Sequence, residues 1–165
     1  MLNRIFPKQI DNTYRGHQLA IWLLVPIIVV KMTMGFNMLI NARELAQTAD
    51  GLPLDSFGAL PAAIIVMDFK TGGLERIVLA TLALVALLRY RAMLPLIYLL
   101  LAFDAVGLMV LWKIDPLPVA RSSGGPSVGF IVNLSLAAAL VIGLALTLGK
   151  TDKGGMPSSA KGLGS

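Results

Sequence analysis

The chain has 165 residues, of which 56% are apolar and only 14% are charged, and its mean hydropathy is +0.79. These values exclude an ordinary water-soluble globule, because soluble domains of this size carry far more charge. The absence of cysteine excludes disulfides, thiolate metal sites and iron–sulfur clusters. The net charge of +5 does not indicate nucleic-acid binding, because the basic residues lie at the ends of long apolar blocks.

The first apolar block covers residues 18–40 and follows a basic N-terminal segment, residues 1–17. At 23 residues the block is longer than the apolar part of a signal peptide, and no cleavage pattern of small residues follows it. We therefore expect a retained membrane helix over 18–40. A loop outside the membrane follows, marked by turn-forming residues that include Pro53 and Gly58.

The second apolar block, residues 61–90, is interrupted by charged residues and glycines. One interpretation is a single long, tilted helix that carries charges in its outer half. The other is a short interfacial segment before a compact span that begins near Leu74. The pattern favours the single helix, with the second interpretation left open.

Two further spans are predicted at residues 93–112 and 128–148, each long enough to cross the apolar core of a bilayer. The tail, residues 149–165, is rich in Gly, Ser and Lys and is expected to be disordered. The predicted fold class is all-α: a polytopic membrane protein with a four-transmembrane-helix bundle over residues 18–148. The expected partner is the lipid bilayer and not nucleic acid.

The distribution of lysine and arginine predicts the orientation of this bundle. Eight of them lie in the N-terminal segment, the loop between the second and third spans, and the tail, against three in the other two loops. Because basic loops stay on the cytoplasmic side, we expect the N-terminal segment and the tail to be cytoplasmic.

Two charged residues stand inside apolar blocks, where a charge costs at least about 2.5–3.5 kcal/mol. Lys31 lies near the middle of the first span and Asp104 near the middle of the third. Counted from the cytoplasmic ends at about 1.5 Å per residue, their depths differ by only about 3 Å, so they can meet if the helices are neighbours. Three interpretations stay open: a structural ion pair, a pathway for protons or substrate, or two separately solvated charges.

The second span adds further candidates if it is one long helix. Asp68, Gly72 and Glu75 then fall on one face at i, i+4 and i+7. This face is predicted to point two carboxylates and a glycine into the bundle, with Glu75 as the stronger candidate. The alternative is that the charges of this segment are hydrated at the outer interface.

Small and polar residues inside the spans predict helix contacts. Gly35 and Gly107 each lie about one turn or less from the charged residue of their own helix and are expected to allow close packing there. Asn37, Asn133 and Ser135 are expected to form hydrogen bonds between helices. No metal site is predicted, because the chain has one histidine and no cysteine. No catalytic motif occurs, so catalytic residues stay unknown.

Three short motifs stand out in these spans: Met34-Gly35-Phe36 in the first span, Gly73-Leu74-Glu75 at the start of the apolar part of the second, and Leu148-Gly149-Lys150 at the end of the fourth. With the four-span layout they resemble the DoxX-like family of small bacterial inner-membrane proteins, over most of residues 18–150. The resemblance implies a compact bundle in a bacterial-type inner (plasma) membrane, with Glu75 inside the membrane. For some members it also implies an association with quinone-linked oxidation.

Three functions follow as hypotheses. The first is an integral inner-membrane protein that carries protons or a small solute past Lys31, Asp104, Asp68 and Glu75, as a homo-oligomer or as a subunit of a membrane complex. The second, implied by the resemblance, is a membrane subunit of a quinone-linked oxidoreductase in which Glu75 or Asp104 handles a proton. The third is a non-catalytic assembly or structural protein. No cofactor is evident in the sequence, and quinone is the candidate that the resemblance implies.

Overall fold

The computed structural model describes residues 5, 12, 14, 16–114 and 128–149. The elements within this part of the chain are helices without strands: α2 (Gln18–Ile40), α3 (Ala42–Thr48), η1 (Leu54–Ser56), α4 (Ala59–Arg89), η2 (Arg91–Met93), α5 (Leu94–Ile114) and α6 (Val128–Leu148). Four of them, α2, α4, α5 and α6, are long and apolar enough to cross a membrane. The prediction of an all-helical chain with four such helices is confirmed for these residues. Residues 150–165 of the predicted disordered tail and most of the N-terminal segment lie outside them.

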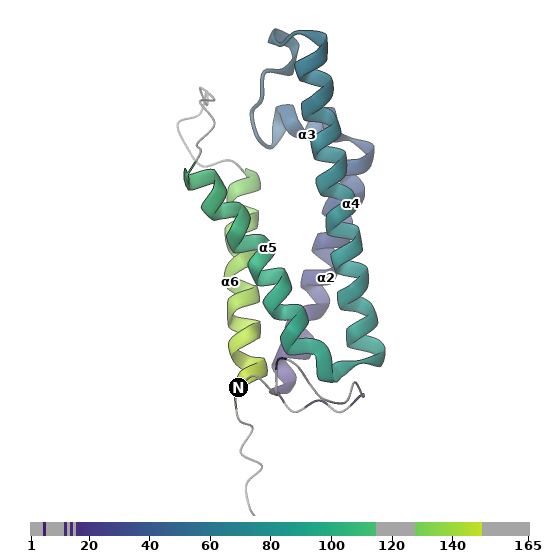
Figure 1. Cartoon of the computed structure of the whole chain (residues 1–165), viewed down its shortest axis with the longest axis vertical. Coiled ribbons are helices and arrows are strands. Elements are labelled where there is room, and N and C mark those ends of the chain that lie inside the picture. The colour runs from purple at the N-terminus through teal and green to yellow at the C-terminus, as the bar shows by residue number, and fades with distance from the viewer. Residues whose placement is uncertain (1–4, 6–11, 13, 15, 115–127, 150–165) are drawn as a thin grey trace, which may run out of the picture.

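The second apolar block forms one uninterrupted helix, α4, of 31 residues. Of the two interpretations of this block, the single helix is therefore the one observed. At about 1.5 Å per residue α4 is about 46 Å long, against about 30 Å for the hydrocarbon core of a bilayer. Its N-terminal end extends past the neighbouring helices, beside α3 (Figure 1).

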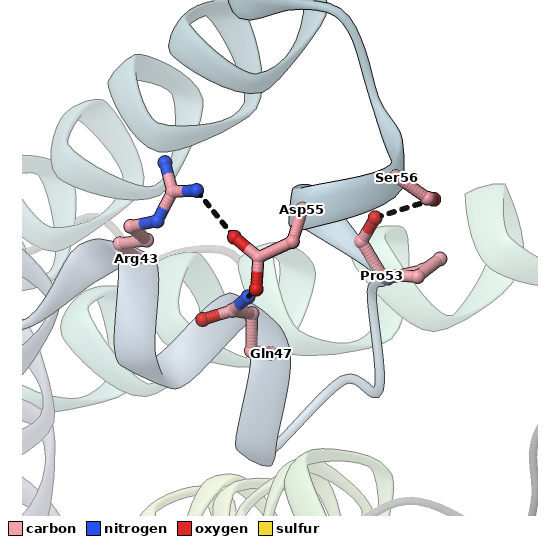
Figure 2. Close-up of polar contacts among 5 residues, drawn as sticks. All are labelled: Arg43, Gln47, Pro53, Asp55 and Ser56. Atoms are coloured by element: carbon pink, nitrogen blue, oxygen red, sulfur yellow. Dashed lines mark hydrogen bonds and ion pairs between the residues drawn. The ribbon is translucent and has the colours of Figure 1, made fainter.

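A polar cluster on α3 holds the short helix η1 in place (Figure 2). Asp55 of η1 accepts hydrogen bonds from Arg43 Nη2 at 2.7 Å and from Gln47 Nε2 at 2.9 Å. The Ser56 hydroxyl closes the turn of η1 by donating to the Pro53 carbonyl at 2.7 Å. The hydrogen bond from Arg43, followed by that from Gln47, holds the pKa of the Asp55 carboxyl below its ordinary value.

The four long helices pack chiefly as two pairs, α2 with α4 and α5 with α6 (Figure 1). α2 and α4 approach closely because two glycines face each other. A Cβ added to Gly73 would lie 2.8 Å from the carbonyl oxygen of Gly35, so neither position has room for a side chain. In the second pair the ring of Tyr98 fills the space over Gly143. The Tyr98 hydroxyl donates to the Ala20 carbonyl at 2.6 Å and so ties the second pair to the first.

The buried core lies in the half of the bundle that contains the start of α2 and the end of α6. The His17 N–H donates to the Leu146 carbonyl at 3.2 Å and joins these two helix ends. In Figure 1 the two pairs lie together in this half and diverge toward the end that carries α3. The core residues come from all four long helices: Ala20, Leu24, Ile27, Ile28, Ala80, Ala83, Ala86, Leu87, Leu94, Ile97, Tyr98, Leu101, Ala102 and Leu140.

Candidate functional site

Lys31 of α2 and Asp104 of α5 form an ion pair that links the two helix pairs. The ammonium Nζ donates to Asp104 Oδ2 at 2.6 Å. The Lys31 side chain is 5% exposed, whereas that of Asp104 is 28% exposed. The structure therefore brings together the two charges that the sequence places at similar depth, and it buries the lysine more completely than the carboxylate.

A small cavity adjoins this ion pair and is lined by residues of all four long helices. Its volume of about 20 Å³ is enough for about one water molecule. The ionisable lining residues are Lys31, Arg76 and Asp104, and Asn133 is the neutral polar one. The rest of the lining is less polar: Met34, Ala105, Leu108 and Leu136. The cavity therefore carries two cations and one carboxylate, and its lining has polar and apolar residues in equal number.

The cavity begins where the apolar core ends. In α2 the last core residue is Ile28 and the first cavity residue is Lys31, while in α5 they are Ala102 and Asp104. In α4 and α6, which run in the opposite direction, the cavity residues come before the core residues along the chain: Arg76 before Ala80, and Leu136 before Leu140. The core therefore closes the bundle on the side of His17, and the cavity lies on the side of α3.

Arg76 of α4 is a cavity residue that the sequence analysis did not select. It is half-buried, and its Nη1 donates to the sulfur of Met38, which is a weak acceptor. Neither of the two ion pairs found within the described residues includes Arg76. The signal in the sequence is its spacing: it stands three residues after the buried Gly73 and four before the buried Ala80.

The predicted carboxylate face of α4 points away from the bundle. Asp68 and Glu75 are both exposed, so the prediction that they join the buried charges is wrong for the single chain. The physical reason is the rotation of α4: the side that meets α2 is marked by Gly73, and residues that share a face with Gly72 lie turned away from it. The structure brings together Lys31 and Asp104 and leaves the other two carboxylates outside.

The predicted packing glycines have different surroundings. Gly35 lies at the close crossing of α2 and α4, whereas a Cβ on Gly72 would make only an ordinary contact, at 3.4 Å, with Met38. A Cβ on Gly107 would meet no atom within 4 Å, so the prediction of close packing at this residue is wrong. Close helix contacts occur instead at Gly73 and Gly143, for which no packing role was predicted.

Two of the three predicted interhelical polar groups bond within their own segment. Asn37 is exposed and accepts a hydrogen bond from Asn41 Nδ2 at 2.7 Å, and Ser135 is exposed and donates to the Ile131 carbonyl at 2.9 Å. The prediction of interhelical bonds is therefore wrong for both, because each side chain has a partner one turn away. Asn133 is half-buried and lines the cavity.

No group of three or more His, Asp or Glu side chains suited to holding a metal ion occurs within the described residues. The chain matches no protein-family model, no curated protein and no solved structure. The fold and the site thus define a helical protein with four helices of membrane-crossing length and a charged cavity between them. These features are compatible with an integral membrane protein.

Proposed function

We propose that this chain is a multi-pass membrane protein whose Lys31–Asp104 pair belongs to a pathway for protons or a small solute. The observation that carries the proposal is the unequal burial of the two side chains, 5% exposed for Lys31 and 28% for Asp104, beside a cavity that both line. An ion pair that only fixes helix register needs no reachable carboxylate. A group that exchanges protons does need one.

The size of the cavity supports protons or a water-sized solute over a quinone. At about 20 Å³ it has room for about one water molecule, and a quinone ring is much larger. A quinone-linked role, as the DoxX-like resemblance implies, would require the helix pairs to separate further. The transport function therefore ranks first.

The orientation that we propose puts the N-terminal segment and the tail in the cytoplasm of a bacterial-type cell. The cavity then faces the outer side of the inner membrane, and the apolar core closes the cytoplasmic half. A solute that enters from the α3 end stops at Lys31 and Asp104, so its passage requires the apolar core in the cytoplasmic half to open. Asp68 and Glu75 are exposed on α4, and a second copy or a membrane partner that covers them fits the same proposal.

The test is proton flux into proteoliposomes, driven by a potential, at matched protein incorporation and orientation. We expect Asp104→Asn to abolish the flux because the amide cannot accept the proton. Asp55→Asn is the matched control, since it makes the same chemical change at an exposed site on η1. Flux that is absent from the native protein, or equal in Asp104→Asn and the control, refutes the pathway.

A further inference from the structure

We propose that the cavity beside the Lys31–Asp104 pair binds a single small monovalent anion of halide type, held chiefly by Arg76. This inference rests on the proposed function and deepens it, because it names the class of solute that the site takes. It starts from the charges that face the cavity from each helix. α2 contributes Lys31, α4 contributes Arg76, α5 contributes Asp104, and α6 contributes the neutral Asn133.

The charges of this site do not balance without an anion. Lys31 and Asp104 neutralise each other at 2.6 Å, which leaves the guanidinium of Arg76 without a paired carboxylate among the described residues. A cation at membrane depth without a counter-charge is costly, and the apolar half of the lining strengthens its attraction for an anion. One monovalent anion in the cavity brings the net charge of the site to zero.

The donors of the site suit an anion. Arg76 has five N–H donors, and the acceptor found for it within the described part of the chain is the Met38 sulfur. Lys31 uses one of its three donors on Asp104, and the Asn133 side chain carries an amide that can donate. Three helices thus supply donors to one small space.

The volume of the cavity sets the size of the ligand. About 20 Å³ accommodates a particle not much larger than a water molecule, which excludes a carboxylic acid with a carbon chain or a phosphate ester. A metal cation of that size is disfavoured by the net positive charge. Fluoride and chloride are therefore the anions to test.

The experiment measures thermal unfolding and calorimetric binding of the full chain in detergent, with sodium fluoride or chloride against sodium gluconate at constant ionic strength. Gluconate is too large for the cavity and controls for general salt effects. We expect saturable stabilisation by a halide, with one ion bound per chain. Equal effects of the halides and gluconate would overturn the proposal.

Two variants test the role of the charges. Arg76→Gln is expected to weaken halide binding at least about tenfold, since it removes a charge-assisted hydrogen bond. Arg43→Gln, which changes an exposed arginine on α3, is its matched control and should bind as the native protein does. Equal binding by the two variants would overturn the role of Arg76.

Asp104→Asn keeps the test decisive if Arg76→Gln does not fold. It removes the carboxylate that opposes the anion, so we expect tighter halide binding, and unchanged or weaker binding contradicts the inference. The same variant is expected to lose proton flux. Loss of flux together with tighter halide binding supports both proposals, whereas flux in a native protein that binds no halide leaves the pathway standing and refutes the anion site.

Discussion

The Lys31–Asp104 ion pair predicts an asymmetric double-mutant cycle. Asp104→Leu leaves the Lys31 ammonium without its partner in a site where the side chain is only 5% exposed. Removing one member of a buried pair costs about 3–5 kcal/mol, and we expect Asp104→Leu to fall in this range. Lys31→Met is expected to cost less, about 1–3 kcal/mol, as for a buried group that loses its hydrogen bond.

Two features of the site explain why Lys31→Met is expected to be less destabilising than Asp104→Leu. Asp104 is 28% exposed, so its carboxylate is more accessible to solvent than the Lys31 ammonium. Arg76 also lines the cavity and remains as a second cation near Asp104. The double variant replaces both charges by apolar side chains and should be less destabilised than Asp104→Leu alone.

The assay is unfolding of the four proteins in one detergent, followed by circular dichroism. The expected coupling between the two changes is about 2–3 kcal/mol. The control cycle uses Arg43→Met and Asp55→Leu, an exposed pair for which a much smaller coupling is expected. Additive effects of Lys31→Met and Asp104→Leu would refute a buried, mutually dependent pair, and a larger cost for Lys31→Met would refute the burial argument.

Three further predictions concern the helix contacts and the α3 cluster. Gly73→Ala is expected to lower stability by about 1–3 kcal/mol, because its Cβ would lie 2.8 Å from the α2 backbone. Gly107→Ala enters open space and should gain up to about 1 kcal/mol from the higher helix propensity of alanine. Thermal unfolding that ranks the two variants in the opposite order contradicts the close crossing of α2 and α4. Gly143→Ala is expected to destabilise the protein, because its Cβ would collide with the ring of Tyr98. In a chain that already carries Tyr98→Ala, the same change should cause no further loss of stability. Additive shifts of the unfolding temperature would contradict this contact. The pKa of the Asp55 carboxyl, measured by carbon-13 NMR titration, should lie below its ordinary value of 3.8. The contribution of this group to stability is then present above pH 3.8 and is lost as the pH falls through the folded-state pKa. A titration midpoint at or above 3.8 contradicts the hydrogen bonds of Figure 2.

Long apolar blocks in the sequence are enough to predict four helices. The predicted span at residues 18–40 coincides with α2, and the block at 61–90 differs from α4 by two residues at its start and one at its end. Depth arithmetic along two such helices also places Lys31 level with Asp104, and their side chains meet. These features follow from helix rise and apolar length alone, both of which can be counted directly along a sequence.

The rotation of each helix about its axis is harder to predict, since lipid and protein core are both apolar and the pattern of apolar residues does not distinguish the inner face. Adjacent residues differ by about 100° around a helix, so the choice between Gly72 and Gly73 decides which face is buried. With Gly73 against α2, Arg76 faces the cavity and Glu75 lies outside.

Small residues in α4 carry the information that fixes this rotation. Gly73, Ala80 and Ala83 are buried, and small side chains are what allow helices in a membrane to approach closely. Positions 73, 76, 80, 83 and 87 follow one another in alternating steps of three and four residues. This is the spacing of residues on one helix face. Arg76 therefore occupies the one large, charged position in an inward-facing stripe of this helix. On the α3 side of the core this arginine lines the cavity together with Lys31 and Asp104.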